Sequence, residues 1–198
     1  QAARCNSQRF TTVGGQPGDI IGDNDLRPAT LNARLAQQWT LNERHQFEMG
    51  MGLLAARRAI RENFSGRPTT ALSDSDAKLM PFLGWTYSFS DSWSLAVTYA
   101  RGYEPPTFGD LLFTEFNPPP PQPVLRSRSL AWQRADSLDL RLEGGSDSLV
   151  VATGPHYAVW RNEWLRLVDD TGAALGTVNA DKTIHAGWET ALSWLAYS

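Results

Sequence analysis

Residues 79–99 read LMPFLGWTYSFSDSWSLAVTY, and their pattern indicates the class of the fold. Large apolar side chains occupy every second position from Leu79 to Phe89, and the alternation resumes from Trp93 to Tyr99 after a short polar break at residues 90–92. Alternation of this length is typical of half-buried β-strands, and the polar break is typical of a tight turn. The stretch therefore predicts an antiparallel β-hairpin.

The same alternation recurs on both sides of this hairpin. The segments that show it, each a strand or a hairpin around a short polar turn, are residues 29–41 and 47–55, residues 138–142 and 149–157, and residues 186–194. Helical periodicity of comparable length occurs nowhere in the sequence. The sequence therefore predicts an all-β fold, an antiparallel meander of about eight strands.

The connections between the predicted strands alternate in length. The short ones are residues 42–44, 90–92 and 144–147, and the long ones are residues 58–76 and 104–131. Aromatic residues gather beside the short ones, at Trp39, Phe47, Tyr87, Phe89 and Trp93. Tight turns at one rim, long loops at the other, strands of about 9–11 residues, an apolar outer band and an aromatic girdle are features of outer-membrane β-barrels. The pattern thus predicts part of a transmembrane β-barrel, a closed sheet that pairs every backbone group away from water.

A soluble β-sandwich that binds carbohydrate through exposed tryptophans is an alternative, because its strands alternate in the same way. The side chains between the large apolar ones favour the barrel. They are small, as at Gly50 and Gly84, or charged, as at Arg34, Glu48 and Arg141. A wet interior accommodates this mixture, whereas a dry core between two sheets would not.

The composition excludes several classes of function. With 18 Lys and Arg against 21 Asp and Glu, the chain has no excess positive charge for a nucleic-acid backbone, so no such partner is expected. The single cysteine, Cys5, excludes an internal disulfide and a cysteine-built zinc site. Three widely spaced histidines form no metal motif, and no Ser-His-Asp arrangement is evident. We therefore expect no metal, no cofactor, no catalytic residue and no enzymatic activity.

Three stretches resemble the motifs of one family. Residues 95–112, LAVTYARGYEPPTFGDLL, follow the pattern Tyr-x-Arg-Gly-aromatic-x-x-Pro-Thr-Phe-x-Glu-Leu, with Asp110 in place of Glu. Residues 137–143, SLDLRLE, follow Glu-x-Gly-x-Arg with two changes, and residues 176–194 contain Asn179 eight residues before the Gly187 of Gly-Trp-Glu. In this order and spacing the three resemble TonB-dependent outer-membrane receptors over residues 77–196, whereas residues 1–76 match only by their alternation.

The resemblance implies the outer membrane of a Gram-negative bacterium and a large barrel with a separate plug domain and a TonB box. We find neither of those parts in the sequence, and the chain begins without Met or an apolar signal. The expectation is that residues 1–198 are a segment of one such barrel domain, from its middle to later part. About eight strands are too few for a 22-stranded barrel, so a complete eight-stranded barrel, an adhesin or an enzyme, is the alternative.

The function implied by the resemblance is active uptake of a scarce ligand, most often a ferric siderophore. Energy would come from the TonB-ExbB-ExbD system through parts of the receptor outside this chain. Outer-membrane lipid and lipopolysaccharide are the other expected partners. Cobalamin, haem and glycans are alternative ligands, and the sequence does not choose among them.

The candidate ligand-binding residues lie in and beside the long connection at 104–131. They are Tyr103, Phe108, Phe113, Phe116, Arg126 and Arg128. The phenylalanines would line an aromatic binding site or pack the loop on itself, and the arginines would attract an anionic ligand or lipopolysaccharide phosphates. The proline run at 118–121 predicts an extended segment that shapes a ligand vestibule or serves only as a spacer. Residues 158–183 are expected to extend two strands beyond the bilayer to a tip at 169–172.

Overall fold

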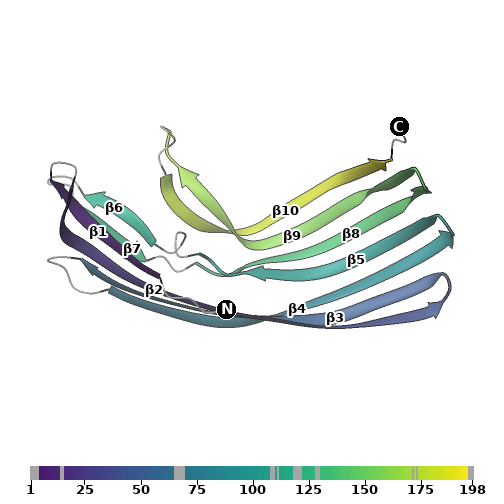
Figure 1. Cartoon of the computed structure of the whole chain (residues 1–198), viewed down its shortest axis with the longest axis horizontal. Helices are drawn as coiled ribbons and strands as arrows, with labels where there is room; N and C mark the ends of the chain where they lie inside the picture. The colour runs from purple at the N-terminus through teal and green to yellow at the C-terminus, as the bar shows by residue number, and fades with distance from the viewer. Residues whose placement is uncertain are drawn as a thin grey trace. The chain divides into compact units, whose positions relative to one another are not determined.

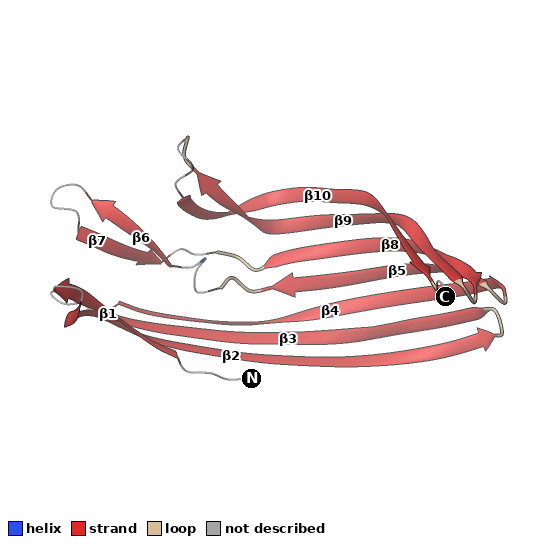
Figure 2. Cartoon of the chain, turned by 45° about the horizontal axis from the view of Figure 1, so that its top comes forward, coloured by secondary structure: helices blue, strands red, loops and turns tan. Residues whose placement is uncertain are grey.

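The computed structural model describes residues 5–13, 16–64, 70–107, 110, 112–117, 122–127, 130–170, 172 and 174–195. Almost all of them belong to ten β-strands (Figure 2). The strands are β1 (Cys5–Val13), β2 (Gln16–Asn42), β3 (His45–Phe64), β4 (Thr70–Ser90), β5 (Trp93–Glu104), β6 (Leu112–Asn117), β7 (Gln122–Ser127), β8 (Gln133–Ser146), β9 (Leu149–Val168) and β10 (Ala174–Trp194). Within these residues no helix is both long and apolar enough to cross a membrane.

Eight of the strands form one sheet in the order β1-β2-β3-β4-β5-β8-β9-β10 (Figure 1). Strands β6 and β7 form a separate antiparallel pair in the connection between β5 and β8. Each strand of the large sheet lies beside the next one along the chain, apart from this inserted pair. The predicted antiparallel meander of about eight strands is confirmed.

The chain divides into two compact units. The first comprises residues 1–33 and 53–78, and the second comprises residues 34–52 and 79–198. In the first unit β1 pairs with the first part of β2, from Cys5 opposite Leu26 to Val13 opposite Gln16. Ala56 and Ile60 are buried there, and the buried Arg58 of β3 forms an ion pair with Asp74 of β4.

The second unit contains the three tight turns, which lie at the same end of its strands (Figure 1). The Asn42 side chain accepts hydrogen bonds from the backbone N–H groups of Arg44 and His45, at 2.9 and 3.0 Å, and so fixes the first turn. Further backbone hydrogen bonds link the turn regions to their neighbours, as from Ser88 N–H to the Arg44 carbonyl at 2.8 Å. The short turns predicted at 42–44 and 90–92 are confirmed within one residue at each end. The third turn, predicted at 144–147, lies at residues 147 and 148, because β8 continues to Ser146.

The predicted strand length of about 9–11 residues is wrong. Strands β3 and β4 have 20 and 21 residues, so most of the long connection predicted at 58–76 is strand. The hairpin of β1 and β2 was likewise missed. In these extensions both faces carry polar side chains. The apolar alternation therefore stops, although the backbone ladder continues. The predicted continuation of two strands over 158–183 to a tip at 169–172 is confirmed, because β9 ends at Val168 and β10 begins at Ala174. That they extend beyond the bilayer stays a prediction.

Candidate functional site

The two faces of the second unit differ in chemistry, because successive side chains of each strand point to opposite faces of the sheet. We call the face of Leu95, Val97 and Tyr99 the outer face. Its register pairs Leu95 with Leu142 and Val97 with Leu140 on β8, and it continues to Trp188 on β10. Trp188 is 66% exposed and Leu140 is 39% exposed, while Leu95 and Val97 are only partly buried. None of these four side chains is sealed beneath a second layer.

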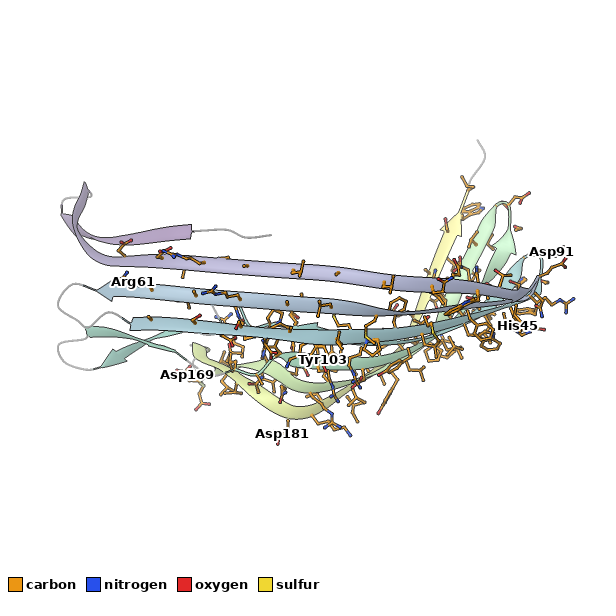
Figure 3. All side chains as sticks on the ribbon, turned by 90° about the horizontal axis from the view of Figure 1, so that it is seen from below. His45, Arg61, Asp91, Tyr103, Asp169 and Asp181 are labelled. Carbon is orange, nitrogen blue, oxygen red and sulfur yellow. The ribbon has the colours of Figure 1, made fainter. Side chains whose placement is uncertain are left out.

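Aromatic rings gather on the outer face beside the tight turns. The ring of His45 stacks on Tyr87 at a centroid distance of 4.8 Å and on Trp85 at 5.9 Å. Trp85 donates its indole N–H to His45 Nδ1 at 3.2 Å, and Tyr87 is followed by Phe89 at 6.3 Å. Figure 3 shows His45 and Asp91 at this end of the sheet. The arrangement matches the aromatic girdle of a membrane barrel, where amphipathic rings lie at the interface.

The opposite, inner face carries charge. Arg34 of β2 lies 3.3 Å from the Glu48 carboxylate of β3 and 4.0 Å above the centre of the Phe82 ring of β4. Gly50 leaves room for this contact, because a Cβ atom there would overlap the Phe82 ring and the Leu35 carbonyl. A charged, partly exposed cluster of this kind suits a water-filled interior.

A second part of the inner face forms an open depression of about 520 Å³ between β8, β9 and β10. Its charged lining comprises Asp139, Arg141, His156 and Glu189. The His156 ring lies over Gly187, where a Cβ would overlap it, and His156 Nδ1 is 3.9 Å from the Glu189 carboxylate. Gly187 and Glu189 are the motif residues noted in the sequence, so this motif places an imidazole and a carboxylate side by side.

The motif residue Asn179 holds the base of the long connection between β5 and β8. Its Oδ1 accepts the Ala131 N–H at 2.9 Å, and its Nδ2 donates to the Ala131 carbonyl at 3.2 Å and to the Asn162 carbonyl at 2.6 Å. Trp164 donates its indole N–H to the same Ala131 carbonyl at 3.0 Å. Next to Ala131, Trp132 is buried. The asparagine thus pairs with Ala131 as a neighbouring strand would.

A polar cluster lies farther along β9 and β10. The Glu163 carboxylate accepts a hydrogen bond from the Thr183 hydroxyl and lies 3.1 Å from His185 Nε2. These contacts, with Thr183 contributing most, lower the pKa of Glu163 below its ordinary value of 4.5. Asn162, just before Glu163, has a φ of 55°, a left-handed conformation that asparagine tolerates. No sequence motif marked this cluster.

The predicted ligand-binding residues fall in three places. Tyr103 is half-buried on β5 opposite Arg134 of β8. On the β6–β7 pair, Phe113 lies opposite Arg126 and Phe116 lies opposite Pro123. Phe108 and Arg128 lie outside the described residues, as do the side-chain positions of Phe113, Phe116 and Arg126. The register therefore places Phe113 and Arg126 at opposite positions of the β6–β7 pair. The role of all six residues in ligand binding stays a prediction.

Comparisons with known proteins identify the class. The family model for the TonB-dependent receptor-like β-barrel matches residues 7–198, so the chain belongs to this family. The structure resembles the ferric yersiniabactin uptake receptor FyuA from Yersinia pestis, with a TM-score of 0.64 and 16% identity over 87% of this chain and 25% of that one. It also resembles the copper transporter OprC, with a TM-score of 0.63 and 14% identity over 98% of this chain and 31% of that one.

The alcaligin receptor FauA from Bordetella pertussis is a third similar structure, with a TM-score of 0.55 and 13% identity over 87% of this chain and 28% of that one. The chain thus spans between a quarter and a third of these proteins, and at such identities the likeness concerns the fold. No curated protein matches the sequence. TonB-dependent receptors are transporters of the Gram-negative outer membrane and are not enzymes. The family therefore overturns the soluble sandwich and the small enzymatic barrel.

Proposed function

We propose that this chain forms part of the barrel wall and extracellular loops of a receptor for TonB-energised uptake of a ferric siderophore. The TonB-ExbB-ExbD system would act through a plug domain and a TonB box in parts of the receptor outside these residues. The observation that carries the proposal is the division of one sheet into an apolar, exposed outer face and a charged inner face. A receptor barrel needs both, one for lipid and one for a wet lumen.

The ligand would be recognised from the extracellular side, at the connection between β5 and β8. Phe113 and Arg126 lie opposite each other there, and Phe116 is on the same pair of strands. A phenylalanine and an arginine at opposite register positions suit a planar, anionic chelate, because arginine binds carboxylate-like oxygens in a forked geometry and aromatic residues stack on flat rings. Phe108 and Arg128, in the same connection, complete the proposed set of contacts. Tyr103 is left out of it, because it shares the outer face of Leu95, Val97 and Tyr99 on β5.

Copper is the second candidate cargo, since the chain is also similar in structure to a copper transporter. The two candidates differ in the form of the metal, because the iron of a ferric siderophore is enclosed in an organic chelate. An experiment with both cargoes therefore separates them.

The test uses the full-length receptor in a strain that lacks its own copy. Uptake of radioactive iron would be measured with a panel of ferric siderophores, and uptake of copper in parallel, each with and without functional TonB. We expect saturable, TonB-dependent uptake of at least one ferric chelate. Copper uptake without iron uptake would make copper, and not a ferric siderophore, the cargo. Uptake that does not depend on TonB would contradict the proposal of TonB-energised transport.

Variants then test the proposed contacts. Arg126→Gln and Phe113→Ala should raise the KM for uptake about tenfold, as expected for loss of a charge-assisted hydrogen bond or a stacked ring. Arg166→Gln is the matched control, because Arg166 is an exposed arginine at the end of β9. An unchanged KM in both variants, with normal receptor levels in the outer membrane, would remove these residues from the site.

A further inference from the structure

The connection between β5 and β8 ends in a segment that is held by side chains of two other strands. Ala131 and Trp132 directly precede β8, which begins at Gln133. The backbone N–H of Ala131 donates to Asn179 of β10 at 2.9 Å, and its carbonyl accepts from Asn179 at 3.2 Å and from the Trp164 indole of β9 at 3.0 Å. Both backbone groups of this residue are therefore bonded to the two strands that follow β8 in the sheet.

The side chains that hold this segment belong to the inner face of the sheet. Asn179 is an even number of residues before Glu189 on β10, with no register shift between them, so both point to the inner face. The register places Trp164 opposite Asn179 and hence on the same face. Ala131, bonded to both side chains, therefore lies over the inner face of β9 and β10. We call Ala131 and Trp132 the strap, because they cross this face before the chain enters β8.

A buried glutamine joins the strap to the other end of the connection. Gln133 is only 8% exposed, and its Nε2 donates to the Glu104 carboxylate at 2.5 Å while its Oε1 accepts the backbone N–H of Trp164 at 3.4 Å. Glu104 is the last residue of β5, so the two ends of the connection meet at this one side chain. A buried amide with these partners favours a single arrangement, because leaving its donor or its acceptor unpaired is costly.

The backbone of β9 has an unusual conformation beside the strap. Asn162 has a φ of 55°, its carbonyl accepts the Asn179 Nδ2 at 2.6 Å, and its own Nδ2 donates to the Trp132 carbonyl at 3.5 Å. Left-handed residues other than glycine persist only where the surrounding contacts determine them, and they gather at functional sites. This conformation is independent of the bonds to Ala131, and it lies at the same point of the inner face.

We propose that Asn179, Trp164 and Gln133 are positioning residues for ligand binding, which hold the strap on the inner face and so fix the place of the β5–β8 connection. The candidate contacts Phe113 and Arg126 belong to that connection, at the end of the strands away from the tight turns (Figure 2). A connection that is held before a ligand arrives loses less conformational freedom on binding, so affinity depends on side chains that do not touch the ligand. The inference rests on the proposed function and deepens it.

The test exchanges the two side chains that join the ends of the connection, in the full-length receptor. Gln133→Glu places a second carboxylate against Glu104, whereas the double variant E104Q/Q133E restores one donor and one acceptor and still accepts the Trp164 N–H. For uptake of the ferric siderophore panel, and of copper in parallel, Q133E should raise KM about tenfold with an unchanged maximal rate, because a smaller fraction of receptors is competent to bind. E104Q/Q133E should return KM to within about twofold of the unchanged receptor, as expected for two coupled residues.

Trypsin added to intact cells reports the state of the connection without any cargo. Arg126 lies on β7, and cleavage after it proceeds from a locally opened state of the connection. Q133E and Asn179→Ala should raise the rate of this cleavage at least tenfold, and E104Q/Q133E should leave it unchanged. Gln46→Glu, the same substitution at an exposed glutamine of β3, is the matched control and should change neither the cleavage rate nor KM.

The outcomes separate this inference from the proposed function. Unchanged cleavage and KM in Q133E, or no recovery in the double variant at normal receptor levels, would overturn the inference. Faster cleavage with an unchanged KM would also overturn it, because the residues would then hold the strap without affecting binding. If no cargo is taken up, the proposed function fails, and the cleavage rates still decide whether these residues hold the strap. Trp164→Phe, which removes one donor and should speed cleavage about fivefold, replaces Q133E if that variant does not assemble.

Discussion

At the scale of single residues, Asn179 has the clearest role, because one side chain replaces a strand partner for Ala131. Its removal by Asn179→Ala deletes three hydrogen bonds, each with a net contribution of about 1 kcal/mol. We expect the backbone at 130–133 to open more often while the rest of the sheet is unchanged. Hydrogen exchange of peptides covering these residues in the full-length receptor should accelerate at least tenfold.

Asn32→Ala is the control for that measurement, since Asn32 is an exposed asparagine on β2. Its exchange at 130–133 should equal that of the unchanged receptor. If Asn179→Ala leaves the exchange of the Ala131 amide unaltered, the asparagine is not what holds the base of the connection.

Glu163 is a second residue with a local prediction, and it lies outside the apolar band, near the end of β9 that leads to the tip at 169–172. Hydrogen bonds from Thr183 and His185 lower its pKa below 4.5, so the folded state favours the carboxylate. This contribution to stability is present above the ordinary pKa and is lost as the pH falls through the lowered value. Glu163→Gln should therefore loosen β9 and β10 at pH 7 and have a shrinking effect below about pH 4.

The measurement is the ratio of hydrogen-exchange rates, variant to unchanged receptor, for peptides covering 160–183 at each pH. Glu143→Gln, an exposed carboxylate near Arg141, serves as the control and should leave these peptides unaffected. A ratio that is constant from pH 7 to pH 3 would show that the carboxylate form of Glu163 does not stabilise this region.

At the scale of elements, β10 spans the proposed bilayer with a tryptophan at its centre and another at its end. Trp188 is six residues from Trp194 and six from Lys182, and both tryptophans are largely exposed on the outer face. In vesicles with brominated lipids, Trp188→Phe should remove fluorescence that is quenched best by bromines deep in the acyl chains. Trp194→Phe should remove fluorescence quenched best by shallow bromines. The same depth profile for both would contradict a membrane-spanning β10.

Elements inside the apolar band were predictable from the sequence, and those outside it were not. Residues 79–99 alternate over a full hairpin because one face meets lipid and the other meets water. Beyond the band, as at Arg58 and Asp74, ion pairs replace apolar contacts and the period of two disappears although the strand continues. The backbone hydrogen bonds that define these extensions leave no trace in side-chain hydrophobicity. The β1–β2 hairpin was missed for this reason.

The candidate sites show the same division. Asn179, Gly187 and Glu189 were recognised as a motif, but their roles depend on partners far along the chain, such as Ala131 and His156, that only the register brings near.

At the scale of the whole molecule, the strand order has a consequence for folding. β10 pairs with β9 on one side, and β1 and β10 are the outermost strands in the order of the sheet. An unpaired strand edge of this length presents many backbone donors and acceptors, which is costly in hydrocarbon and favours edge-to-edge association in water. In the similar receptors the matched part is only 25–31% of the chain, so further strands are available to cover such edges.

We therefore expect residues 1–198 produced alone and refolded in detergent to associate through their strand edges. Light scattering after size-exclusion chromatography should give oligomers or aggregates, whereas the full-length receptor in the same detergent should give one defined species. Association should fall when a proline replaces a residue at the centre of β10, as in Ile184→Pro, because proline removes a backbone donor and disrupts the edge. A monomer with full strand content would instead mean that the chain covers its own edges, as a complete small barrel does.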